Sequence, residues 1–209
     1  MVLNLGCIVE GHGEVEAVPE LLRRIWRELE PGFYLKVQRP WRIGRYKLVK
    51  VGELETAIER MTRQLPSPRA ILILIDAETD CPGKLGPELL ARAKVARPDI
   101  PTGLVLAKHE FEAWFLAAIE SLRGQCGIAD DAEEVPDPEA VSDAKGFVKH
   151  NMEWGRGYSE TVDQPALTAS FDMQLARRRS ASFDKCWREV ERLFAKASRG
   201  PGHEGPESG

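Results

Sequence analysis

Carboxylate side chains follow three segments of the chain that have the apolar composition of β-strands. Each group stands where its predicted strand ends: Glu10 and Glu14 after the first, Asp76, Glu78 and Asp80 after the second, Glu110 and Glu112 after the third. Parallel strands of an α/β sheet end at one shared edge, so we expect these acids to lie close together. Carboxylates at short range repel one another, and a bound cation would relieve the repulsion. Oxygen ligands without His or Cys favour Mg²⁺ or Mn²⁺ over zinc.

A second interpretation of the same acids stays open. A carboxylate in the first turn of a helix stabilises that helix by about 0.3 to 1 kcal/mol through the helix dipole, without any ligand. For Glu14 and Glu112 the sequence does not choose between this role and a metal site. For Asp76 the metal site is favoured, because this residue directly follows an aliphatic strand.

A basic segment follows the second predicted strand of the chain. Its positive residues are interleaved with Trp41 and Tyr46, and they are Lys36, Arg39, Arg42, Arg45, Lys47 and Lys50. Cations neutralise phosphates and aromatic rings stack on bases, so this composition is typical of a nucleic-acid-binding surface. The candidate contacts to nucleic acid are Arg39, Arg42, Arg45 and Lys47. The alternative is a solvated loop whose arginines pair with surface acids of the same protein.

The element around which the chain is organised is a run of five aliphatic residues at 71–75, which ends at Asp76. Because it has no polar alternation, it predicts a strand buried on both faces, as in the centre of a parallel sheet. Predicted strands at residues 2–9, 33–37, 70–76 and 102–107 alternate with predicted helices at 14–30, 52–65, 87–97 and 113–122. A glycine turn at residues 11–13 joins the first strand to the first helix. The alternation predicts an α/β fold with a mainly parallel four-stranded sheet flanked by helices.

The composition changes after residue 123. An acidic stretch with prolines at residues 128–140 predicts an exposed loop, and three helical patterns follow at 141–152, 165–179 and 183–197. We therefore predict an α/β domain over residues 1–123 and a helical extension packed on it over residues 124–197. Residues 198–209, rich in Gly, Pro and Glu, are predicted to form a disordered tail.

The overall composition narrows the possible functions. Hydrophobic residues make up 43% of the 209 residues, which suffices for a core. The net charge is −4, so attraction to nucleic acid has to come from a local basic patch. The four cysteines are scattered, without the spacing of a zinc site. Neither a signal peptide nor an apolar run of about 20 residues is present, so we expect a soluble cytoplasmic protein without a membrane contact.

Two strand ends, Ile8-Val-Glu10-Gly and Asp76-Ala-Glu78, resemble the TOPRIM (topoisomerase-primase) domain of primases, topoisomerases and old-lysogenisation-type nucleases. The whole chain more closely resembles a bacterial TOPRIM-like family that is known only as a domain of unknown function. That second resemblance rests on the order of five segments across residues 1 to about 195, namely residues 9–11, 75–77, 109–114, 163–164 and 179–183.

The resemblance implies a TOPRIM-like or Rossmann-like sheet in which Glu10 is the general acid or base of phosphodiester chemistry. It also implies that Asp76 and its neighbours bind Mg²⁺. The usual Asp-x-Asp pair is Asp76-Ala-Glu78 in this chain, which puts catalysis in question, and Asp80 is a candidate replacement for the second aspartate.

The function that we expect from the resemblance is that of a Mg²⁺-dependent nuclease or related phosphodiester-acting enzyme. At the level of the family, this implies a role in bacterial genome defence with an ATPase as a candidate partner. The alternative is a non-catalytic module that binds nucleic acid or protein through the same fold. A third, less favoured function is phosphoryl transfer or hydrolysis on a small molecule, since the same acids would suit a nucleotide's metal.

Overall fold

The computed structural model describes residues 1–198 of the chain. In this part, five parallel strands form one sheet. The strands are β1 (Val2–Val9), β2 (Tyr34–Val37), β3 (Trp41–Arg42), β4 (Arg69–Asp76) and β5 (Thr102–Ala107). They lie in the order β2-β1-β4-β5, and β3 pairs with the end of β1. The predicted α/β fold with a mainly parallel sheet is confirmed.

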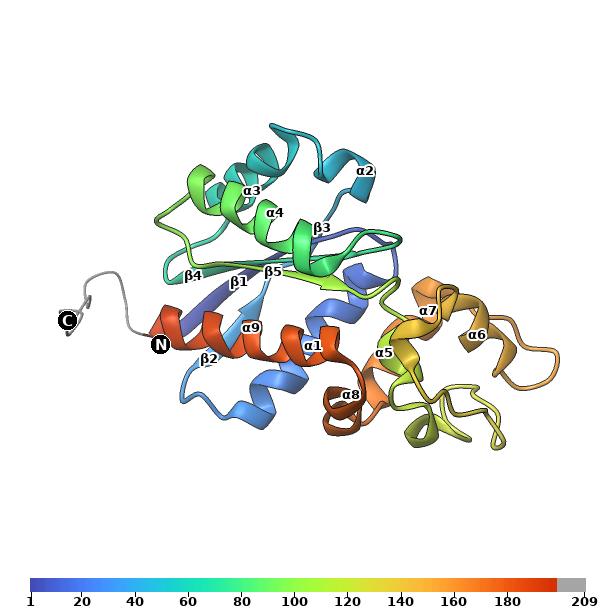
Figure 1. The fold of residues 1–209 in the computed structure, drawn as a ribbon. Helices are drawn as coiled ribbons and strands as arrows, with labels where there is room; N and C mark the ends of the chain where they lie inside the picture. The colour runs from blue at the N-terminus through green and yellow to red at the C-terminus, as the bar shows by residue number, and fades with distance from the viewer. Residues whose placement is uncertain (199–209) are drawn as a thin grey trace, which may run out of the picture.

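Helices cover both faces of the sheet (Figure 1). The helices α1 (Glu14–Leu29) and α9 (Ala181–Ser198) pack on one face, whereas α3 (Glu53–Gln64) and α4 (Pro82–Ala96) pack on the other. The alternation of side chains along β4 explains how one strand serves both layers. Residues 70, 72 and 74 pack in the core cluster of α1 and α9, and residues 71, 73 and 75 in the cluster of α3 and α4.

The basic segment contains regular structure that we did not predict. Trp41 and Arg42 form β3 beside Ile8 and Val9 of β1, and the amide of Ile43 donates to the carbonyl of Val9 at 2.8 Å. A short helix, α2 (Arg45–Leu48), follows at once. The basic segment is therefore fixed beside the carboxyl end of β1.

Several predicted helix boundaries were wrong because capping residues were misassigned. The helix after β4 begins at Pro82, so Pro82 and not Pro87 occupies its first turn. The predicted helix at residues 165–179 is two helices, α7 (Glu160–Ser170) and α8 (Met173–Arg179), because the carboxylate of Asp172 caps α8 by accepting the amide of Leu175.

The remaining helical elements are short. The predicted helix at residues 113–122 is divided into α5 (Ala113–Leu116) and the 3-10 helix η1 (Ile119–Leu122). The acidic stretch contains the 3-10 helix η2 (Pro138–Ala140), and α6 covers Ala144–His150. Helices α5 to α8 gather beyond the edge at which the strands end (Figure 1).

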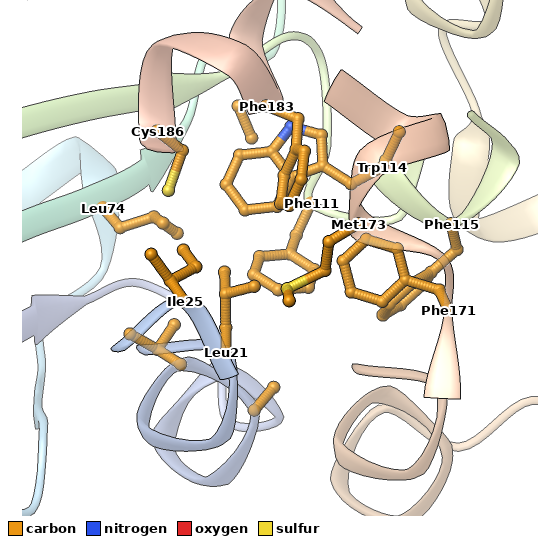
Figure 2. Packing of buried hydrophobic residues seen from close by; sticks show 14 of the residues in the cluster. Leu21, Ile25, Leu74, Phe111, Trp114, Phe115, Phe171, Met173, Phe183 and Cys186 are labelled. Atoms are coloured by element: carbon orange, nitrogen blue, oxygen red, sulfur yellow. The ribbon is translucent and has the colours of Figure 1, made fainter. Parts of the chain in front are cut away.

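A cluster of aromatic rings joins these short helices to the sheet (Figure 2). The rings of Phe111, Trp114, Phe115, Phe171 and Phe183 are fully buried, and their neighbouring centroids lie 4.7 to 5.6 Å apart. Most of these pairs meet edge to face, the arrangement that aromatic quadrupoles favour. The core cluster on the α1 and α9 face of the sheet therefore continues into the helical region without a break.

The predicted tail lies almost wholly outside the described residues. Ser198 is the last residue of α9, and residues 199–209 are not described. Among residues 1–198, no helix combines the length and the apolar composition that crossing a membrane requires.

Candidate functional site

The strand register brings Glu10 and Asp76 to the same edge of the sheet. Val9 pairs with Leu74, and Asp76 pairs with Ala107 at the end of β5. Because side chains alternate along a strand, Asp76 follows Leu74 to the face of α1. Glu10 directly follows the end of β1, so the edge predicted from the sequence exists and carries both acids.

Two further acids are buried beside this edge. Glu14 and Glu112 are each only 2% exposed. Oε2 of Glu14 accepts the backbone amides of Glu10 and Gly11 at 2.9 and 3.2 Å, and Oε1 of Glu112 accepts the hydroxyl of Tyr158 at 2.9 Å. The carboxylate of Glu14 thus closes the turn that presents Glu10.

Asp76 is the acid whose burial is least compensated by hydrogen bonds. Its Oδ1 atom is buried and has no hydrogen-bond partner among the described residues. Burial raises the pKa of Asp76 well above its usual range. Four neighbouring carboxylates raise it further: Glu14, Glu112, Glu10 and Glu110. The acids that follow β1 and β5 therefore lie within electrostatic range of Asp76, which ends β4.

The pKa of each buried neighbour is raised as well. Burial raises the pKa of Glu14 to about 7, although the two backbone amides that it accepts oppose the change. Burial also raises the pKa of Glu112, against the charge of Lys145 and the hydroxyl of Tyr158. For Glu10 burial is again the largest cause, and backbone hydrogen bonds from Arg45 and Asp76 oppose it.

The Glu14→Gln variant tests this burial through the pH dependence of stability. The folded wild type keeps a proton on Glu14 that the unfolded chain releases between pH 4.5 and about 7. Its contribution to stability is therefore complete below pH 4.5 and is lost as the pH rises through about 7, a loss of up to about 3 kcal/mol. Urea unfolding in EDTA across this range should show a shallower fall in the free energy of unfolding for Glu14→Gln. Equal slopes for the two proteins would contradict the assignment.

Glu78 and Asp80 do not join the buried acids. Their side chains are exposed, and both pair with the guanidinium of Arg45, whose Nη1 lies 3.5 Å from Oε2 of Glu78. The side chain of Arg45 is only 13% exposed. Among residues 1–198, no three Asp, Glu, His or Cys side chains are arranged to hold a metal ion as they stand. The predicted metal ligands therefore divide into a buried group with Asp76 and an exposed pair held by Arg45.

The turns after β4 and β5 are tied together by unusual backbone geometry. Glu78 and His109 both have left-handed backbones, with φ of 49° and 59°. The amide of Glu78 donates to the carbonyl of His109 at 2.9 Å, and Nδ1 of His109 lies 2.8 Å from the carbonyl oxygen of Glu78. Non-glycine residues adopt this region rarely, and they concentrate at functional sites. Hydrogen bonds thus join the turns after β4 and β5 at the edge that carries the acids.

The predicted nucleic-acid contacts have different surroundings. Arg39 and Arg42 are exposed, and Nη1 of Arg42 lies 3.4 Å from the carbonyl oxygen of Glu10. Lys47 pairs with Glu53 at 3.6 Å. Arg45, by contrast, is occupied by Glu78 and Asp80.

A pocket of about 620 Å³ lies between this segment and α3, and we call it the Trp41 pocket. The residues that line it include Trp41, Arg42, Lys47 and Arg60. The guanidinium of Arg60 lies over the ring of Trp41, 5.3 Å from its centroid. We did not predict Arg60, because it lies on α3 and no local spacing connects it with the basic segment.

Comparison with known proteins identifies a family for nearly the whole chain. The model of a family described as "Domain of unknown function (DUF4276)" matches residues 9–191. The chain belongs to this family. No curated protein and no solved structure matches the chain. The prediction that the chain belongs to a family of unknown function is confirmed, and the relationship of that family to TOPRIM domains stays a prediction.

The matched DUF4276 region includes two contacts that sequence spacing did not reveal. Tyr158 donates to Glu112, and the backbone amide of Lys145 donates to Oε2 of Glu110 at 2.8 Å. The partners in these contacts are 46 and 35 residues apart in the chain. The helical region of this DUF4276 protein therefore forms part of the surroundings of the acids.

Proposed function

We propose that this DUF4276 protein is a TOPRIM-like, Mg²⁺- or Mn²⁺-dependent enzyme that cleaves phosphodiester bonds of nucleic acid. The observation that carries the proposal is the buried, unpartnered Oδ1 of Asp76, which lies among carboxylates that repel it. A buried polar atom without a partner is rare in folded proteins and calls for an explanation such as an ion.

The residues present are chemically suited to a hard divalent cation. Asp76 and Glu10 each have a buried oxygen without a partner, and all the acids near them offer oxygen donors alone. A cation would compensate both the burial of these charges and their repulsion. Asp76 would hold it, with Glu10, Glu14 and Glu112 as charged neighbours. When bound, it would supply a positive charge that stabilises the negative charge of a phosphate under attack.

Glu10 is the residue that we propose as general base. It is half-buried, and its raised pKa makes its carboxylate a stronger proton acceptor than an exposed glutamate. The hydrogen bond of Arg42 to its backbone keeps the turn in place beside β3. The Trp41 pocket nearby, with its aromatic ring and cations, supports a nucleic acid as the substrate.

Glu10→Gln tests this function. We expect the change to reduce Mg²⁺-dependent cleavage by about 10²- to 10⁴-fold, the usual contribution of a general base. Cleavage of single- and double-stranded oligonucleotides would be compared with Mg²⁺ binding measured by calorimetry, which should persist in the variant. Glu16→Gln is the matched control, because Glu16 is exposed on α1. Cleavage by Glu10→Gln at the rate of the wild type would refute the proposal.

A second candidate function is a binding module without turnover. The observation that favours it is the pairing of Glu78 and Asp80 with Arg45, which leaves fewer acids for a metal. Salt-sensitive binding of nucleic acid without cleavage, weakened by Arg42→Ala, would support this function. A role in genome defence with an ATPase partner rests on the TOPRIM resemblance alone, and it accompanies the first candidate.

A further inference from the structure

A second pocket lies where the helical region meets the turn after β1. Its volume is about 500 Å³, and we call it the Lys149 pocket. The residues that line it include His12 from that turn, Lys145 and Lys149 from α6, Tyr158 from the segment before α7, and Glu160 at the start of α7. None of these residues was predicted to take part in the site.

Two residues that line the Lys149 pocket donate hydrogen bonds to acids near Asp76. The hydroxyl of Tyr158 donates to Glu112, and the backbone amide of Lys145 donates to Glu110. Both acids raise the pKa of Asp76, so the pocket opens beside the same charges that we propose for the metal site.

One charge of the Lys149 pocket has no counterion. Nζ of Lys145 pairs with Glu160 at 2.8 Å, and Asp143, which also lines the pocket, accepts the amide of Gly146 at 2.8 Å to cap α6. Lys149 is exposed and forms no ion pair with any carboxylate in residues 1–198. Its ammonium group is therefore free to receive an anion.

The two pockets lie on opposite sides of the acids. The Trp41 pocket adjoins Glu10 through Arg42, and the Lys149 pocket adjoins Glu112 through Tyr158. Asp76 lies within the field of both Glu10 and Glu112. In Figure 1, α2 and α3, which line the Trp41 pocket, lie on one side of the sheet, whereas α6 and α7, which line the Lys149 pocket, lie beyond the ends of the strands.

We propose that the Lys149 pocket binds a backbone phosphate of a polynucleotide strand that continues through both pockets, with the bond to be cleaved at Asp76 and Glu10. This inference rests on the function proposed above and narrows its substrate. A base that stacks on the Trp41 ring or on the Arg60 guanidinium that lies over it has to be unpaired, so the strand is single at the Trp41 pocket. A substrate held on both sides of the acids is cut at an internal bond, and a free nucleotide would fill one pocket at most.

Lys149→Ala tests the phosphate contact through the salt dependence of binding. Wild type and variant would be titrated with a fluorescent single strand of roughly 16 nucleotides and with a dinucleotide, in Ca²⁺ to limit turnover. We expect the variant to bind the long strand about threefold to tenfold more weakly, and the slope of log affinity against log salt to fall by about 0.7. Dinucleotide binding should stay unchanged.

Lys94→Ala is the control, since Lys94 is exposed in the last turn of α4, at the opposite edge of the sheet. An unchanged affinity and salt slope for Lys149→Ala, or no binding of the long strand by the wild type, would overturn the inference. A Lys149 effect on binding without any cleavage would keep the phosphate contact and overturn the proposed catalysis.

Closed circular single-stranded DNA tests the internal position of the cut. The wild type with Mg²⁺ should linearise the circle, because no strand end is needed to fill both pockets. Trimming of linear strands combined with resistance of the circle would overturn the two-sided path while leaving the nuclease function intact.

Discussion

Asp76→Asn should abolish binding of Mg²⁺ and Mn²⁺ and reduce metal-dependent cleavage by about 10²- to 10³-fold, while the protein stays folded. A metal-bound phosphate gains several kcal/mol of charge stabilisation in the transition state, and each 1.36 kcal/mol corresponds to a factor of ten. The substitution keeps the shape of the side chain and removes the carboxyl group, whose pKa is raised by burial. The free energy of unfolding without metal should therefore be equal or higher near neutral pH.

Asp80→Asn is the matched variant, which distinguishes a metal site at Asp76 from one at the exposed pair. Asp80 follows the same strand, but its carboxylate is exposed and pairs with Arg45. Calorimetric titration of both metals and cleavage assays would be run on both variants, with urea unfolding to establish that they fold. Metal binding that survives Asp76→Asn would contradict the proposed site, and metal binding lost only in Asp80→Asn would assign it to the exposed pair.

Gly13→Ala should destabilise the protein by about 2 to 4 kcal/mol, in the range of overpacked or disrupted cores. A Cβ atom at Gly13 would overlap Oε1 of Gln164 and the backbone carbonyl of Glu160, whose carbon would lie 2.9 Å away. Backbone atoms of α7 cannot move aside as a flexible side chain can. The methyl group would therefore push α7 away from α1.

The backbone conformation of Gly13 distinguishes a loss of stability caused by contact with α7 from one caused by backbone strain. Its φ of −66° and ψ of −35° are helical, so alanine alone would be neutral or slightly stabilising there. Gly11→Ala in the same turn is the control, because the nearest atoms to its Cβ belong to Glu14 at 3.6 Å, an ordinary contact. Urea unfolding would compare the two variants. A stable Gly13→Ala protein would show that α7 does not pack on the turn as closely as described.

Much of the α/β architecture followed from local patterns in the sequence. The uninterrupted run at residues 71–75 predicted a strand buried on both faces, and β4 is such a strand. The end of β1 at Val9 and the beginning of α1 at Glu14 also agree with the prediction. These features depend on residues that are close in the chain, which is why spacing and composition sufficed.

The grouping of the acids required the tertiary structure. The sequence placed Glu78 and Asp80 with Asp76, because all three follow one strand. The structure separates them, since Arg45, more than thirty residues earlier in the chain, pairs with both exposed acids. A local pattern cannot show which cation a carboxylate will meet when that cation comes from a distant segment.

The sequence by itself determined the α/β class, the strand ends and the presence of Glu10 and Asp76 at them. Only the tertiary structure decided that Glu112 is buried and bonded to Tyr158, and that α6 and α7 enclose a pocket beside it. The physical reason is that burial and pKa depend on what covers a side chain. Here the covering residues come from the helical region, far along the chain from the strands that carry the acids.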